Sequence, residues 1–276
     1  MSGGWPTASA EQSTSGASRS VLKPRGSVTN TGAGSLAGMN IAWTVAGGVI
    51  GFAAGMLLRI TVFRLSVASG EPARTMCPRC AIPISGRAHF RIRCAHCHSW
   101  FGVPLVLELV TATVLALLLG RFAGLPDAAA FAFLGALGVA LAAIDIAVQR
   151  LPDRLTLPLY PGLIALFGLA TVFNGQPANL VRALLGGVAL GGGYLILALV
   201  SRGQLGGGDV KLAGGLSIAL GWLGWPTLVT GAALGFVLMG VVSLVLLAAR
   251  RITLQHAISF GPFMLAGALV SILASA

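Results

Sequence analysis

Acidic side chains are scarce in this sequence. Its 276 residues include only seven Asp and Glu, and charged residues of both signs make up 9%. Soluble domains carry about 25% charged residues. Hydrophobic residues reach 56% and the mean hydropathy is +0.89. These values exclude an ordinary soluble domain and indicate a polytopic membrane protein, for which the lipid bilayer is the surrounding partner.

The positive charge has a simple origin in such a protein. The net charge of +11 comes from 18 Lys and Arg. They are not concentrated on one face of a soluble unit, so nucleic acid is not expected as a partner. An excess of Lys and Arg in a membrane protein marks instead the loops that stay in the cytoplasm.

The N-terminal segment differs from the rest of the chain. Residues 1–40 are rich in Ser, Thr, Gly and Ala, and they lack the apolar side chains that would repay the entropy of ordering. We therefore expect a disordered tail over 1–40. Basic residues, not a small-residue cleavage site, follow the first apolar run, which indicates a retained helix. The further expected parts are the first transmembrane helix with a cysteine-containing loop, 41–102, and a second transmembrane part, 103–276.

Apolar windows of about the length that crosses a bilayer recur along the chain. They lie near 41–58, 103–120, 128–148, 156–174, 182–200, 211–225, 227–248 and 257–275. The predicted fold class is therefore all-α: a polytopic transmembrane helical bundle of about eight spans.

Basic residues predict the orientation of these spans. The odd-numbered loops contain Arg59, Arg64, Arg74, Arg79, Arg87, Arg91, Arg93, Arg150, Arg154, Arg202, Arg250 and Arg251. The even-numbered loops contain only Arg121 and Arg182. The odd loops are thus predicted to lie in the cytoplasm and both termini outside.

Two aspartates adjoin apolar runs. Asp145 lies near the end of the third window and Asp209 just before the sixth, so both are expected at the cytoplasmic face. An ionisable group at membrane depth is costly unless it pairs or faces water, which makes it a functional candidate. Two neighbouring carboxylates can share a proton and hydrolyse an amide bond as base and acid. Gly206 and Gly208 would allow close approach of a substrate. The alternative is two interfacial residues, with Asp209 as a helix cap.

The first predicted loop contains all the cysteines of the chain in two Cys-x-x-Cys units, separated by thirteen residues: Cys77, Cys80, Cys94 and Cys97. This spacing is typical of a structural zinc knuckle, in which four thiolates form a tetrahedral site. A reducing cytoplasm favours metal over disulfides, and bound zinc would stabilise a loop too small for its own core. A dithiol redox pair is the alternative. Histidines that could replace a ligand, or simply lie on the surface, are His89, His96 and His98.

Three further motifs accompany the aspartates: Leu-Pro-Asp-Arg from Leu151, Gly-Gly-Gly-Asp-Val-Lys from Gly206, and Phe-Gly-Pro from Phe260. In order and spacing, from about residue 45 to 275, they resemble the type IV prepilin leader peptidases, membrane aspartic peptidases of the Gly-x-Gly-Asp class. The resemblance implies that Asp145 and Asp209 are the catalytic pair. It also implies removal of a short basic leader from type IV pilin-like precursors at the cytoplasmic side of the plasma (inner) membrane.

Many members of that family also methylate the new N-terminal amine with S-adenosylmethionine. Here the sequence departs from the family's pattern, with Leu58-Arg59 in place of Leu-Asn and Ile92 in place of Gly before the second cysteine pair. Methyl transfer is therefore an open question. Glu108 matches a family acid and is a candidate for that function or for orienting the loop. Its alternative interpretation is an interfacial helix residue.

The other motif residues are expected to support the site. Asp153, after Pro152 in a turn, is expected to cap the fourth helix or to hold the loop. Lys211 is expected to reach the interface or to attract an acidic substrate residue. The Phe-Gly-Pro segment is interpreted as the start of the last helix. Rival functions are a proton-coupled transporter, a non-catalytic zinc-knuckle scaffold and a peptidase for other intramembrane substrates.

Overall fold

The computed structural model describes residues 1, 39–68, 70–84, 93–102, 105–201, 205–251 and 259–275. Residues 2–38 lie outside this part of the chain, so the predicted disorder of the tail is not tested. The described residues contain eight helices and no named strand. The helices are α1 Ile41–Leu65, α2 Val106–Arg121, α3 Ala128–Val148, α4 Asp153–Asn174, α5 Pro177–Val200, α6 Gly207–Leu223, α7 Trp225–Ala248 and α8 Gly261–Ala274.

Each helix overlaps one of the predicted windows, which confirms the all-α class. Five helices are long and apolar enough to cross a membrane, namely α1, α3, α4, α5 and α7. The helices α2, α6 and α8 have 16, 17 and 14 residues, so they are shorter than the other five. The protein is thus a multi-pass membrane protein, and five of its eight described helices meet this criterion of length and composition.

Two helix boundaries differ from the prediction in a way that matters for function. Helix α1 continues past residue 58 to Leu65, because Arg59 is buried against α2 and not exposed in a loop. Helix α6 begins at Gly207, so Asp209 belongs to its first turn.

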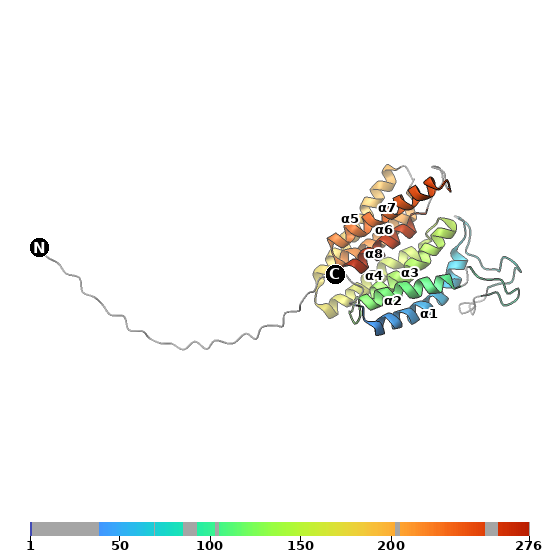
Figure 1. Cartoon of the computed structure of the whole chain (residues 1–276), viewed down its shortest axis with the longest axis horizontal. Coiled ribbons are helices and arrows are strands. Elements are labelled where there is room, and N and C mark those ends of the chain that lie inside the picture. Colours follow the sequence, from blue (N-terminus) through green and yellow to red (C-terminus); the bar gives the residue numbers. More distant parts are fainter. Residues whose placement is uncertain are drawn as a thin grey trace. The chain divides into compact units, whose positions relative to one another are not determined.

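Glycines allow the helices to approach closely. On α1, Gly47, Gly51 and Gly55 recur every four residues and face α2, where an added Cβ would come within 2.5–2.6 Å of the α2 backbone. Such small-residue faces are the usual packing surfaces of helices in lipid. Helix α6 is buried almost throughout from Leu212 to Trp222. In Figure 1, α1 and α2 lie on one side of the bundle and α5 and α7 on the other, with α6 between them.

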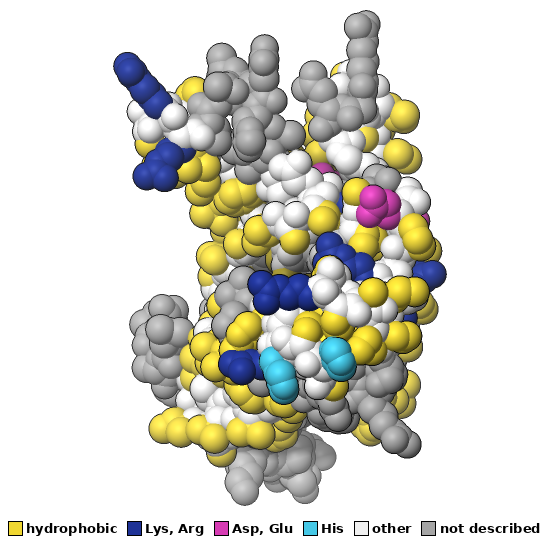
Figure 2. Space-filling view, turned by 90° about the vertical axis from the view of Figure 1, so that its right-hand side faces the viewer, with side chains coloured by type: hydrophobic (Ala, Val, Ile, Leu, Met, Phe, Trp, Pro, Cys, Tyr) yellow, Lys and Arg dark blue, Asp and Glu magenta, His cyan; other side chains and the backbone are white. Residues whose placement is uncertain are grey.

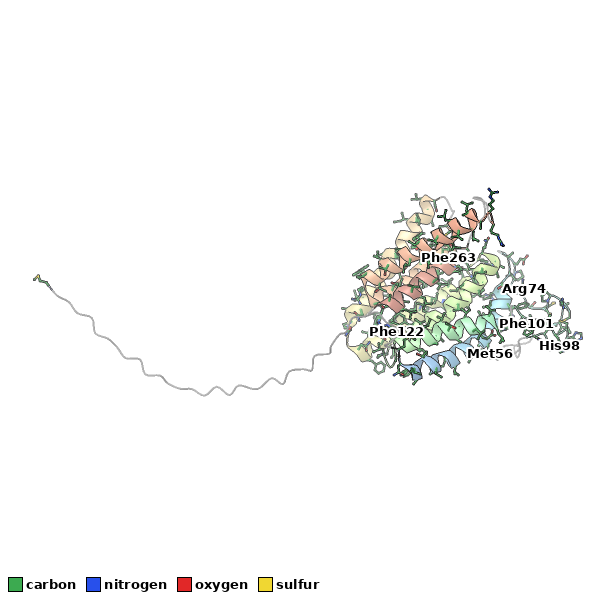
Figure 3. All side chains as sticks on the ribbon, viewed as in Figure 1. Met56, Arg74, His98, Phe101, Phe122 and Phe263 are labelled. Carbon is green, nitrogen blue, oxygen red and sulfur yellow. The ribbon has the colours of Figure 1, made fainter. Side chains whose placement is uncertain are left out.

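The loop between α1 and α2 projects from one end of the bundle. Figure 2 views this end and shows basic, acidic and histidine side chains gathered among hydrophobic ones. Figure 3 places Arg74, Phe101 and His98 at this end and Phe122 at the opposite end. This end of the bundle therefore carries charged side chains of both signs.

Candidate active site and metal centre

Asp145 is held by the start of the last helix. It lies in the last turn of α3 and is 4% exposed. Its Oδ2 atom accepts hydrogen bonds from the Ser259 hydroxyl and from the Gly261 backbone N–H, the latter at 3.1 Å. Since Gly261 begins α8, the carboxylate lies at a helix N-terminus, where free N–H groups and the helix dipole favour negative charge.

Asp209 is partly buried in the first turn of α6. Its carboxylate interacts electrostatically with that of Asp145 and with Tyr194 of α5. The residue that caps α6 is Gly206, so the interpretation of Asp209 as the helix cap is wrong. The two aspartates lie near enough to interact electrostatically although 63 residues lie between them in the sequence.

The glycines near these carboxylates lie in positions where an added Cβ would come close to a neighbouring side chain. A Cβ on Gly261 would lie 2.5 Å from Asp145 Oδ2, and one on Gly206 would lie 3.3 Å from Asp209 Oδ2. A Cβ on Gly208 would lie 2.8 Å from the Cβ of Leu151. Leu151 is thus packed against the first turn of α6, and its Cδ1 atom also lies beside Gly261.

The predicted supporting residues connect α4 to α6. Lys211 Nζ lies 2.6 Å from Asp153 Oδ1, in a pair that remains exposed. The expected helix cap by Asp153 is wrong, because Pro152 occupies the cap position and Asp153 is the first helical residue. The Tyr160 hydroxyl donates to the backbone carbonyl of Lys211 at 2.7 Å. An ion pair and a hydrogen bond therefore fix the helix that carries Asp209.

Sequence reasoning missed three residues near the pair. Ser259 directly precedes the Phe-Gly-Pro motif, and the position of that motif at the same predicted membrane face was the available signal. Tyr160 and Tyr194 are the two tyrosines of the whole chain, and both lie near Asp209 or its helix. Their rarity was a second signal. Tyr194 also stacks on Phe236 and Phe260, with ring centroids 5.6 and 6.2 Å away.

Two cavities adjoin this region. The larger, of about 700 Å³, is lined almost entirely by apolar residues of α1, α2, α3 and α8, including Ile146 and Pro262, which directly follow Asp145 and Gly261. The smaller, of about 330 Å³, is more polar and is lined by Glu71, Arg150, Leu151, Pro152, Asp153 and Arg154, among others. The Arg150 guanidinium, which lines this cavity, donates to the Ala68 carbonyl at 2.9 Å.

The four predicted cysteine ligands converge. Their sulfur atoms all lie within 4.8 Å of one another, and the Cys77–Cys97 and Cys80–Cys94 sulfurs are 3.7 and 3.6 Å apart. A tetrahedral zinc site with Zn–S bonds of about 2.3 Å requires sulfurs about 3.8 Å apart. Hydrogen bonds to the Ser99 hydroxyl lower the pKa of Cys77, to about 6, and that of Cys97, whereas burial and the neighbouring thiols raise the pKa of Cys80 to about 12. The cluster therefore fits a four-coordinate metal.

The two halves of the cluster repeat the same backbone fold. Each Cys-x-x-Cys turn is followed by a residue with left-handed backbone, Ala81 at φ 55° and His98 at φ 52°. An isolated β-bridge closes each half, Met76 with Pro83 and Arg93 with Trp100. In the part of the chain that the structure describes, no histidine joins the group that could hold a metal. His89 lies outside that part.

Glu108 is paired inside the helical bundle. It is fully buried on α2, and both of its carboxylate oxygens accept hydrogen bonds from Arg59. Arg59 also donates to the Phe101 carbonyl at 3.2 Å, at the end of the cysteine loop. Glu108 is therefore a buried, ion-paired residue of α2 and not an exposed one. The contact with Arg59 favours a role in orienting the loop.

Comparison with known proteins identifies relatives. Residues 131–245, which include Asp145 and Asp209, match the type IV leader peptidase family. A protein of Burkholderia pseudomallei strain 1026b, named prepilin leader peptidase/N-methyltransferase, is 31% identical over 83% of this chain and 84% of its own length. Proteins of the same name from Dickeya chrysanthemi and Escherichia coli K12 are 39% and 36% identical, over 66% and 62% of this chain and 61% and 72% of their own lengths. No solved structure matches.

Proposed function

Because this chain belongs to the type IV leader peptidase family, we propose that it is a membrane aspartic endopeptidase that removes the short basic leader from type IV pilin-like precursors. The observation that carries the proposal is the electrostatic interaction of Asp145, whose carboxylate lies at the N-terminus of α8, with Asp209 in the first turn of α6. The family match leaves nothing in favour of a proton-coupled transporter or a non-catalytic scaffold.

The chemistry follows from two carboxylates that share one proton. The ionised carboxylate accepts a proton from a water molecule, and the protonated one donates to the oxygen of the scissile carbonyl. Like charges at short range do not ionise together readily, so the pair offers a base and an acid at once. Neither a metal nor a covalent intermediate is needed for this hydrolysis.

The apolar cavity of about 700 Å³ supports access of the substrate from the bilayer. We assign it to the apolar segment of the precursor, which follows the leader. The argument is continuity: α3 and α8 line the cavity and also hold Asp145. A segment in the cavity would place the peptide bond that precedes it beside the carboxylates.

The basic loops support an orientation with the carboxylate pair at the cytoplasmic side of the plasma membrane. Within the chain, residues 103–276 form the proposed peptidase domain, and residues 41–102 contribute the first helix and the metal-binding loop. Zinc is the proposed structural ion of Cys77, Cys80, Cys94 and Cys97. When bound, it would neutralise the thiolates and fix the two halves of the loop.

The relatives' name includes an N-methyltransferase, and S-adenosylmethionine is the proposed methyl donor. The polar cavity of about 330 Å³ suits such a ligand, because Glu71 and Asp153 could accept from ribose hydroxyls, and Arg150 and Arg154 could bind its carboxylate. The donor would supply the methyl group to the new N-terminal amine of the product.

Asp→Asn variants test the peptidase. Asp145→Asn and Asp209→Asn are expected to abolish cleavage of a co-encoded pilin-like precursor in membranes, with unchanged protein levels. Asp127→Asn is the matched control, because Asp127 lies at the other end of α3 from Asp145. Asp127 accepts a hydrogen bond from the Trp222 indole N–H, and the amide oxygen of Asn can accept the same hydrogen bond. Mass measurement of the product N-terminus reports cleavage position and methylation together. Full activity in either site variant would refute the assignment.

A further inference from the structure

The two carboxylates have unequal surroundings. Two donors, the Ser259 hydroxyl and the Gly261 N–H, share a single oxygen of Asp145, Oδ2. The Asp209 carboxylate lies against the Gly206 backbone, and among the described residues no hydroxyl group donates to it. Hydrogen bonds to an ionised carboxylate are stronger than those to a neutral acid, so this arrangement distinguishes the two aspartates.

We propose that Ser259 is a positioning residue that assigns the water-activating role to Asp145 and the acid role to Asp209. The inference rests on the proposed peptidase function and deepens it. Ser259 acts through Asp145, because its hydroxyl and the Gly261 N–H occupy Oδ2 and leave Oδ1 to accept a proton.

The resulting reaction balances. Oδ1 of Asp145 takes a proton from water while the water oxygen bonds to the scissile carbonyl carbon, and Asp209 gives its proton to the carbonyl oxygen. The product of this step is a neutral diol. The protonated Asp145 then donates to the amide nitrogen as the C–N bond breaks, and Asp209 takes a proton from one diol hydroxyl. A carboxylic acid and an amine leave, and both aspartates regain their starting forms.

Ser259 lies just before the start of α8, where its hydroxyl can reach Asp145. The residue is partly buried and immediately precedes Phe260, the cap of α8. The start of α8 provides one backbone donor to Asp145, the Gly261 N–H, and the Ser259 hydroxyl adds a second donor. Without it, the carboxylate would keep one of two hydrogen bonds and could rotate about its χ2 angle.

The test compares three substitutions at one position in the full chain, purified in detergent, with a purified pilin-like precursor as substrate. Ser259→Ala removes the donor, Ser259→Thr keeps it, and Ser259→Cys offers a weak donor of similar size. Ser201→Ala is the control, because Ser201 is also partly buried and its hydroxyl donates to a backbone carbonyl at the end of α5. Cleavage rates at several precursor concentrations give kcat and KM separately.

We expect Ser259→Ala to lower kcat about 10- to 100-fold, as for loss of a hydrogen bond to a charged group, with KM within about twofold of the wild type. Ser259→Thr should recover most of kcat, and Ser201→Ala should match the wild type. A wild-type kcat in Ser259→Ala, or a Thr variant as slow as the Ala variant, overturns the proposal. If the Ala variant does not elute as a folded species, a wild-type kcat in Ser259→Cys overturns it equally. A wild-type protein that cleaves no precursor would instead refute the proposed function.

Discussion

The buried ion pair between Arg59 and Glu108 gives a sharp stability prediction. Arg59 is 3% exposed and Glu108 is fully buried, and two guanidinium nitrogens donate to the carboxylate. Replacing Glu108 with Ala would leave a buried positive charge without its main partner. Removing one member of a buried ion pair costs about 3–5 kcal/mol. We therefore expect Glu108→Ala to lower the unfolding temperature by on the order of 10 °C.

Removing both charges should reverse most of this loss. In Arg59→Met/Glu108→Leu, apolar side chains of similar size replace the pair, a change that is often neutral for stability. The Phe101 carbonyl would still lose the donor that Arg59 provides at 3.2 Å. An unsatisfied buried acceptor costs about 1–3 kcal/mol, so the double variant should be more stable than Glu108→Ala but below the wild type.

The assay is thermal unfolding of the purified protein in detergent, followed by tryptophan fluorescence. The control is Lys211→Ala, which breaks an ion pair whose side chains are 42% and 58% exposed. Exposed pairs contribute less than about 1 kcal/mol, so this variant should unfold near the wild-type temperature. The reasoning is refuted if Glu108→Ala and Lys211→Ala unfold at the same temperature, or if the double variant is no more stable than Glu108→Ala.

Two further predictions concern the glycine stretch and the metal. Gly208→Ala should strongly reduce precursor cleavage, because the added Cβ would lie 2.8 Å from the Cβ of Leu151. Gly207→Ala should cleave normally, because a Cβ added there would meet no neighbouring atom within 4 Å. Equal cleavage by the two variants would contradict this reasoning. Metal analysis of the purified protein should find one zinc per chain. The zinc content should fall strongly in Cys94→Ser and stay unchanged in His96→Ala. A lower zinc content in the histidine variant would contradict a four-cysteine site.

The helices were predictable because apolar windows of membrane length have few competing interpretations. Topology predicted that Asp145 and Asp209 lie at the same face, and the resemblance to the leader peptidases implied that they form a pair. The cysteine cluster followed from spacing. All three are patterns along the chain, in which residue type and separation determine the geometry.

What the sequence did not reveal were contacts between distant residues. Nothing local links Arg59 to Glu108, so a basic residue after an apolar window was assigned to a loop. Ser259 lies 114 residues from Asp145, and its hydroxyl finds that carboxylate only through the packing of α8 on α3. The pair of Lys211 with Asp153 depends in the same way on how α4 meets α6.

The hydrogen bonds that Ser259 and Gly261 donate to Asp145 have a consequence for biosynthesis. A chain emerging from the ribosome inserts α3 long before α8, so Asp145 enters the membrane without the donors of Ser259 and Gly261. A nascent chain that has reached only α7 would contain both aspartates yet lack the contacts that fix one of them. Asp145 thus acquires both of its hydrogen-bond donors only after the last described helix has packed against α3.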